Sequence, residues 1–263
     1  MRAFACDLDR TLIGEDVEFR PRTKRAIHAA RETGLHVLIV TGRMYQSAVR
    51  YAHDAGLDDP LVCYQGAVVA DPQTGEFLRH VPIPLDLARD AIGQVEAAGY
   101  PLNVYVDDEL YVARETPESD RYAKFQKLAV HAVGDLLAWL DRPPTKLVCV
   151  GDPLELDALE VRMKAHFDGR LFISKSLPHF LEFAHRDVTK GSGLEFLAGR
   201  LGFTREQTVA FGDGENDVEL LEWAGYAVAV ANAHPKALAL ADLVCPSVDE
   251  EGVAQVIEAY LAR

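Results

Sequence analysis

Two acidic residues near the start of the chain have the types and the spacing needed to hold a cation. Asp7 and Asp9 stand one residue apart, directly after the apolar run 4–6, and Thr11 follows them. A strand projects alternate side chains to one face, so the two carboxyl groups lie together if the strand continues, or surround a common point if the chain turns. Either arrangement brings like charges together, and a divalent cation bound by carboxylate and carbonyl oxygens offsets that repulsion. The alternative interpretation is a strand end followed by an ordinary turn or helix cap.

Three more polar segments follow apolar runs in the same way. Thr41 and Gly42 follow one run, Gln65 and Gly66 follow the next, and the loop 212–217 follows a third. If these runs are parallel strands, all the polar segments lie at the carboxyl ends of the strands, where open α/β sheets bind ligands. That shared location favours one active site over a set of unrelated turns.

Each of these segments has another interpretation when it is taken alone. Thr41 with Gly42 could form a helix cap and a turn. The loop 212–217 could be an acidic turn or a weak calcium loop, although it lacks the frame of an EF-hand. Lys190 precedes a predicted helix, whose unpaired N–H groups attract anions, but a lone lysine there is usually a solvated surface charge. The prediction of a single site therefore depends on all of the segments together.

The elements that position these residues follow from the hydrophobic pattern. Helices are predicted at 21–31 and 45–55, and strands at 35–40 and 61–64. This alternation is typical of a doubly wound, Rossmann-like parallel sheet of the α/β class, and it resumes in the last part of the chain.

The middle of the chain breaks the alternation. Hairpins and helices between residues 82 and 186 predict an α+β module with an antiparallel sheet. We therefore expect two domains. Residues 1–81 and 187–263 would form a catalytic core, and residues 82–186 would form an α+β domain inserted into it.

Composition and charge limit the partners. The chain has 263 residues and a formal net charge of -14, which repels nucleic-acid phosphates and anionic lipid, so neither nucleic acid nor a membrane is expected as a partner. No apolar run is long enough to span a bilayer, and the first residues lack the apolar region of a signal peptide. We expect a cytoplasmic monomer or small homo-oligomer. The cysteines lack zinc-site spacing and are expected to be buried free thiols: Cys6, Cys63, Cys149 and Cys245.

The motifs, taken in order, resemble those of the haloacid dehalogenase superfamily, whose members are mostly phosphatases. Asp-x-Asp-x-Thr, Thr-Gly-Arg, Lys-Gly and Gly-Asp-x-x-Asn-Asp occur in that order, and the large insertion resembles the C2-type cap of the Cof-like phosphatases of subclass IIB. The likeness covers essentially the whole chain. It implies a Mg²⁺-dependent phosphomonoester hydrolase that acts on a small phosphorylated metabolite, such as a sugar phosphate or a cofactor phosphate, through an aspartyl-phosphate intermediate.

The resemblance also implies a role for each motif residue. Asp7 would be the nucleophile, and Asp9 would act first as general acid and then as general base. Mg²⁺ would be held by the side chains of Asp7 and Asp213 and by the backbone carbonyl of Asp9. The remaining residues would bind the phosphoryl group (Thr41, Gly42 and Lys190) or orient the metal ligands and metal-bound water (Asn216 and Asp217).

Two groups of residues are expected to select the substrate. Gln65 and Gly66 belong to the core, whereas the cap would exclude water and contact the leaving group. The cap candidates lie in the stretch that returns to the core: Lys175, Ser176, His179 and Glu182.

Two departures from the family pattern bear on the site. Arg10 stands where the family usually has glycine, and its long cation either projects away or leans toward the substrate. Gln65 stands where the Cof-like group often has asparagine, which puts a substrate contact there in doubt.

Other functions use similar residues. A phosphohexomutase with a similar cap would transfer the phosphoryl group to an acceptor other than water. A phosphorylation-regulated binding module, like a response-regulator receiver, also places acids, threonine and lysine on a parallel sheet. Its phosphoacceptor, however, lies on a central strand well after an acidic pair, and the insertion has no use in it. A glycosyltransferase would need a sugar-nucleotide site, and none is apparent.

Overall fold

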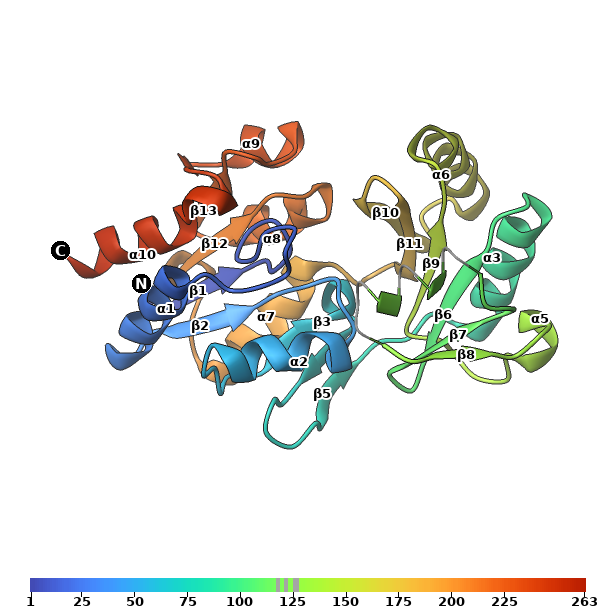
Figure 1. Cartoon of the computed structure of the whole chain (residues 1–263), viewed down its shortest axis with the longest axis horizontal. Coiled ribbons are helices and arrows are strands. Elements are labelled where there is room, and N and C mark those ends of the chain that lie inside the picture. Colours follow the sequence, from blue (N-terminus) through green and yellow to red (C-terminus); the bar gives the residue numbers. More distant parts are fainter. Residues whose placement is uncertain (117–118, 121–122, 125–127) are drawn as a thin grey trace. The chain divides into compact units, whose positions relative to one another are not determined.

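The computed structural model describes residues 1–116, 119–120, 123–124 and 128–263. The chain divides into two compact units, which are described separately (Figure 1). The first unit comprises Met1–Arg79 and Thr189–Arg263, and the second comprises His80–Val188. Within the described residues, no helix combines the length and the apolar character that crossing a membrane requires.

A five-stranded sheet forms the centre of the first unit. Its strands pair in the order β14-β13-β12-β1-β2, and each neighbouring pair is parallel, which confirms the predicted parallel sheet. In this sheet β1 lies between two strands, one of which comes from the far end of the sequence. The strands are β1 (Ala3–Cys6), β2 (His36–Ile39), β12 (Thr208–Gly212), β13 (Tyr226–Val230) and β14 (Leu243–Cys245).

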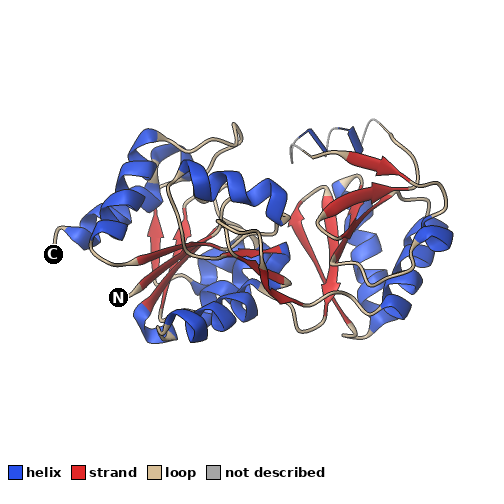
Figure 2. Ribbon diagram, turned by 90° about the horizontal axis from the view of Figure 1, so that it is seen from below, coloured by secondary structure: helices blue, strands red, loops and turns tan. Residues whose placement is uncertain are grey.

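Helices cover both faces of this sheet (Figure 2). Side chains alternate along β1, so Ala3 joins the core cluster that contains Leu194 of α7, whereas Phe4 packs edge-on against Tyr260 of α10 with ring centroids 5.4 Å apart. The helices of this unit are α1 (Pro21–Glu32), α2 (Tyr45–Asp54), α7 (Lys190–Leu201), α8 (Val218–Trp223), α9 (Pro235–Leu240) and α10 (Gly252–Leu261).

The segment at residues 61–64 differs from its prediction as a third parallel strand. An isolated parallel bridge joins Val62 to Val40, but the continuous partner of β3 (Leu61–Cys63) is the antiparallel strand β4 (Val68–Ala70), and β5 (Phe77–His80) completes a separate three-stranded sheet. Left-handed backbone at residues 64–66 turns the chain back directly after β3. The hydrophobic pattern does not report such a turn.

The second unit is built on a six-stranded sheet of order β10-β11-β9-β6-β7-β8. Its described pairs are antiparallel except β7 with β8, and its apolar face packs on helices, as expected for an α+β module. The strands are β6 (Leu102–Val106), β7 (Glu109–Val112), β8 (Val130–Ala132), β9 (Lys146–Val150), β10 (Leu171–Leu177) and β11 (Phe180–His185). The helices are α3 (Leu85–Ala97), α5 (Leu136–Trp139) and α6 (Pro153–Phe167).

Candidate active site

The parallel register of the first unit brings the predicted residues to one edge of the sheet. Cys6, the last residue of β1, pairs with Ile39 of β2 and with Phe211 of β12. Asp7 directly follows β1, and its backbone N–H donates to the Phe211 carbonyl at 2.9 Å. Because Asp213 directly follows β12, these two carboxylates meet at the carboxyl ends of neighbouring strands.

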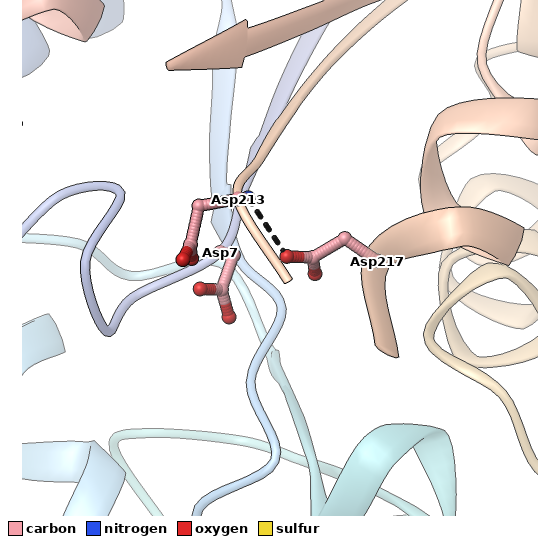
Figure 3. A group of neighbouring side chains, drawn as sticks. All are labelled: Asp7, Asp213 and Asp217. Carbon is pink, nitrogen blue, oxygen red and sulfur yellow. Dashed lines mark hydrogen bonds between the residues drawn. The ribbon is translucent and has the colours of Figure 1, made fainter. Parts of the chain in front are cut away.

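Three buried carboxylates form the centre of this site (Figure 3). One oxygen of each of Asp7, Asp213 and Asp217 lies within 4.8 Å of the others, and these side chains could hold a metal ion. Hard divalent cations prefer such oxygen ligands, so the donor set fits Mg²⁺. The sequence predicts the first two as ligands and Asp217 as a supporting residue.

Lys190 neutralises part of this negative charge. It is the first residue of α7, only 1% exposed, and its Nζ lies 2.5 Å from Asp7 Oδ1 and 2.6 Å from Asp217 Oδ1. A capping box between Thr189 and Ser192 fixes the start of the helix that carries it. The surface-charge interpretation of this lysine is therefore wrong.

The site holds more negative than positive charge. Burial, followed by the charge of Asp217, raises the pKa of the Asp7 carboxyl well above its ordinary value, while Lys190 pulls it down in part. Burial and the charge of Asp217 also raise the pKa of Asp213 to about 7. Burial favours the neutral form of Lys190, but the adjacent Asp217 and Asp7 outweigh burial and raise its pKa. A divalent cation would favour the ionised forms of both raised carboxyl groups.

Both carboxylate oxygens of Asp217 already have partners. Oδ1 accepts from Lys190, and Oδ2 accepts from the backbone N–H groups of Asp213 at 2.9 Å and Gly214 at 2.8 Å. Gly212 is needed beside it, because a Cβ there would stand 2.7 Å from the Asp217 Cβ. Asp217 thus holds the loop and the lysine in place, an arrangement suited to the supporting role predicted for it.

Asp9 faces an arginine and is not part of this carboxylate group. Arg43 Nε donates to Asp9 Oδ2 at 2.7 Å, and its Nη2 donates to Oδ1 at 2.6 Å. Arg43 has a place in the Thr-Gly-Arg motif, but the sequence predicts no role for it. That motif is the signal that could have pointed to it, but nothing in the sequence shows which acid it meets.

Two of the residues predicted to bind phosphate or substrate, Thr41 and Gln65, lie close to this arginine. Thr41 is fully buried, and its Oγ1 accepts from the Arg43 N–H at 3.2 Å. Gln65 is also buried, and its Oε1 accepts from Asn216 Nδ2 at 3.1 Å. A Cβ at Gly42 would stand 2.5 Å from the Gln65 amide nitrogen, so glycine allows that side chain to lie across the motif.

Arg10 lies beside the carboxylate group. Its Nη1 is 3.6 Å from Asp213 Oδ2, and it exchanges hydrogen bonds with Asn232, the Arg10 carbonyl accepting at 2.9 Å. Thr11 also donates to Asp213, at 3.1 Å. Of the two orientations that the sequence allows for Arg10, the structure thus has the one directed toward the site.

The candidates of the second unit have partners within that unit. Ser176 Oγ donates to Glu182 at 2.6 Å, and the buried Lys146 lies 3.2 Å from the same carboxylate. The other two candidates have separate partners, Lys175 with Asp157 and His179 with the Gly151 carbonyl. The structure therefore brings Ser176 and Glu182 together. A substrate contact for any of them stays a prediction.

A comparison with known families shows which family the chain belongs to. The model of the haloacid dehalogenase-like hydrolases matches residues 4–257. The chain belongs to this family. The match confirms the resemblance found in the motifs, and it covers both units of the structure.

Relatives within the haloacid dehalogenase family agree with this assignment. The chain is 28% identical to the 5-amino-6-(5-phospho-D-ribitylamino)uracil phosphatase YitU of Bacillus subtilis, over 98% of this chain and 97% of that one. The crystal structure of TM0651 from Thermotoga maritima is 30% identical, with a TM-score of 0.83 over 98% and 97% of the chains. The subclass IIB sugar phosphatase BT4131 shares the fold, with a TM-score of 0.87 and 22% identity over 99% of both chains.

The protein is therefore an enzyme, a phosphatase of the haloacid dehalogenase family. This finding counts against the phosphorylation-regulated binding module. The carboxylate group and its buried lysine are the catalytic candidates of this phosphatase.

Proposed function

We propose that the protein is a Mg²⁺-dependent phosphomonoester hydrolase that forms an aspartyl-phosphate on Asp7. The observation that carries this proposal is the position of the Asp7 carboxylate. It is buried at the end of β1, between the Lys190 ammonium and the Asp213 carboxylate. A buried nucleophilic carboxylate with a fixed cation on one side can approach an anionic phosphoryl group.

The reaction would proceed in two displacements. A carboxylate oxygen of Asp7 forms a bond to phosphorus while the bond to the leaving oxygen breaks, and Asp9 gives that oxygen a proton. Water then attacks the aspartyl-phosphate, Asp9 accepts the proton, and inorganic phosphate leaves as Asp7 is regenerated. The Asp9 carboxylate is hydrogen-bonded to Arg43 and lies outside the group formed by Asp7, Asp213 and Asp217, so its side chain would be available for proton transfer.

The metal would be held by the side chains of Asp7 and Asp213 and the backbone carbonyl of Asp9. When bound, Mg²⁺ supplies positive charge that offsets the repulsion between these carboxylates and the substrate phosphate. The raised pKa of both carboxyl groups supports a cation at this place. Thr41, Gly42 and Lys190 would contact the phosphoryl oxygens.

The substrate would be a small phosphorylated metabolite, such as a sugar phosphate or a cofactor phosphate. Two relatives support this class, since YitU is named for a phosphoribityl substrate and BT4131 for sugar phosphates. The second unit, from about residue 82 to 186, would act as the specificity domain. Its candidates Lys175 and His179, with Gln65 and Gly66 of the core, would contact the leaving group.

A phosphate-release screen over a panel of phosphometabolites, with Mg²⁺ and with EDTA, tests the proposal. Wild type is expected to release inorganic phosphate only with the metal, and Asp7→Asn is expected to be inactive. Asp54→Asn is a matched control, because that carboxylate pairs with Lys24 on the surface. An active Asp7→Asn enzyme contradicts the covalent mechanism, and an isomeric sugar phosphate in place of free phosphate indicates a mutase.

A further inference from the structure

Arg43 makes a two-point contact with the Asp9 carboxylate. The Nε···Oδ2 and Nη2···Oδ1 distances are 2.7 and 2.6 Å, so two parallel N–H groups of the guanidinium meet the two oxygens of one carboxylate. Such a fork fixes the plane and the direction of the carboxylate as well as its position. A single-point contact, such as that of a lysine, would leave the carboxylate free to rotate.

The arginine is itself held from several sides. It is 3% exposed, its Nη1 donates to Ser47 Oγ at 3.1 Å, and its guanidinium lies 5.3 Å from the centre of the Tyr51 ring. Its backbone carbonyl accepts from the Tyr64 N–H at 2.8 Å. Both side-chain supports come from α2, so the direction of Asp9 depends on an element outside its own loop.

The two partners differ in how much of each reaches solvent. The Arg43 side chain is 2% exposed, whereas the Asp9 side chain is 25% exposed. A carboxylate offers about four lone-pair sites, and the fork occupies two of them, one on each oxygen. The carboxylate therefore keeps acceptor sites and an exposed edge. An ion pair that contributed to stability alone would not need an exposed carboxylate edge.

We propose that Arg43 is a positioning residue for the second half of the reaction. This inference rests on the proposed function, because the two-point contact has this role only if Asp9 activates water. Arg43 holds the Asp9 side chain in one orientation. In the second half of the reaction, the water oxygen forms a bond to phosphorus and the bond from phosphorus to the Asp7 oxygen breaks. The Asp9 carboxylate receives the water proton. In this proposal Arg43 acts through Asp9.

Hydrolysis of p-nitrophenyl phosphate by the full chain with Mg²⁺ separates the two half-reactions. Nitrophenolate leaves without a proton, so loss of the base slows only the second half-reaction. For Arg43→Met we expect kcat to fall about 10²-fold, as a displaced catalytic group does. We expect kcat/KM to stay within about threefold of wild type, because it reports the first displacement. Rapid mixing should show a burst of nitrophenolate, and acid quenching should trap a phosphoenzyme.

Three further variants complete the test. Arg43→Lys keeps the charge but lacks the fork and should fall between wild type and Arg43→Met. Ser47→Ala removes a support of the arginine and should act in the same direction with a smaller loss, which keeps the test valid if Arg43→Met folds poorly. Arg22→Met is the matched control, because Arg22 makes a similar two-point contact with Glu258 on the surface. It should behave as wild type.

Asp9→Asn distinguishes failure of this inference from failure of the proposed function. If Asp9→Asn shows the burst, and the double variant with Arg43→Met is no slower than Asp9→Asn alone, the two residues act as one unit and the inference stands. A burst in Asp9→Asn with none in Arg43→Met overturns the role of Arg43 and leaves the function intact. If neither variant shows a burst and Asp7→Asn remains active, the proposed function itself is wrong. Equal losses of kcat and kcat/KM in Arg43→Met, or a rise in kcat, also overturn the inference.

Discussion

Gly66 lies directly against the carbonyl of Thr189, the residue that caps α7. A Cβ at Gly66 would stand 2.1 Å from the Thr189 oxygen, and the glycine has φ +103°, a conformation that favours glycine. The turn after β3 and the start of the helix that carries Lys190 are therefore in contact through backbone atoms. Neither can shift without moving the other.

Gly66→Ala is expected to lower both stability and phosphatase activity. The added methyl group meets the backbone of Thr189 and Gly193, so the helix start and Lys190 must move. We expect a loss of about 2–4 kcal/mol in the free energy of unfolding. Gly202→Ala is the matched control, because Gly202 also has a positive φ (+73°) but a Cβ there would meet no described atom within 4 Å, so it should cost only about 1 kcal/mol. Urea unfolding and phosphate release measure the two effects. Equal losses in both variants would mean that strain at φ, and not the close contact, decides the result.

Lys190→Met is expected to destabilise the metal-free protein by about 3–5 kcal/mol, because removal of one partner leaves buried charge uncompensated. Its Nζ is the shared partner of Asp7 and Asp217, and the lysine is almost fully buried. Lys236→Met is a surface control, since Lys236 pairs with Glu215 while 59% of its side chain is exposed, and it should cost less than about 1 kcal/mol. Urea unfolding in EDTA compares them. Similar costs for the two variants contradict a central role for the buried lysine.

The stability of the metal-free protein is expected to fall as the pH rises from about 4 to about 7. The pKa of Asp213 is raised from its ordinary value of 3.8 to about 7 in the folded protein. Between these values the folded state binds a proton that the unfolded state lacks, so this contribution to stability is present at low pH and lost as pH approaches 7. Urea unfolding of wild type and Asp213→Asn at several pH values in EDTA isolates the contribution of Asp213 to the free energy of unfolding. A difference between the two proteins that does not change with pH contradicts the raised pKa.

Metal binding is expected to depend on pH in the opposite sense. A cation at the carboxylate group must displace the proton of Asp213, and that of Asp7, whose pKa is raised as well. The apparent affinity for Mg²⁺ should therefore rise with pH and begin to level off above about 7. Calorimetric titrations with Mg²⁺ in two buffers of different ionisation enthalpy count the protons released. Affinity and proton release that are the same at pH 5.5 and pH 8 would argue against the carboxylate group as the metal site.

Arg10→Gly is expected to strengthen Mg²⁺ binding by about three- to tenfold at pH 8, where proton competition from Asp213 is weak. The Arg10 guanidinium lies 3.6 Å from Asp213 Oδ2 and repels a second cation there, and its partial exposure keeps the effect moderate. Arg10 also has φ +62°, so glycine relieves backbone strain. Arg20→Gly is a control, because Arg20 pairs with surface acids, Asp16 and Asp249. Weaker Mg²⁺ binding in Arg10→Gly would show that the arginine supports the metal site.

The strand-end location of the site could be predicted because its signals are local. Apolar runs followed by acids, threonine or glycine are short stretches of chain, and parallel strands place their carboxyl ends together whatever their order. Asp7, Thr41 and Asp213 could therefore be assigned to one edge of one sheet before the pairing of the strands was known. The turn after β3 could not be predicted, because non-glycine residues at positive φ, such as Gln65, leave no mark in the hydrophobic pattern.

The sequence by itself determined the family, the parallel sheet and the acids that meet at its edge. Only the tertiary structure decided the partners of the site residues: Lys190 between Asp7 and Asp217, Arg43 on Asp9, and Asn216 on Gln65. The physical reason is sequence distance. The partners stand between 27 and 183 residues apart, and the direction of a side chain is set by the packing of the elements around it. A motif identifies the charged residues of a site, and the packed fold determines which of these residues are in contact.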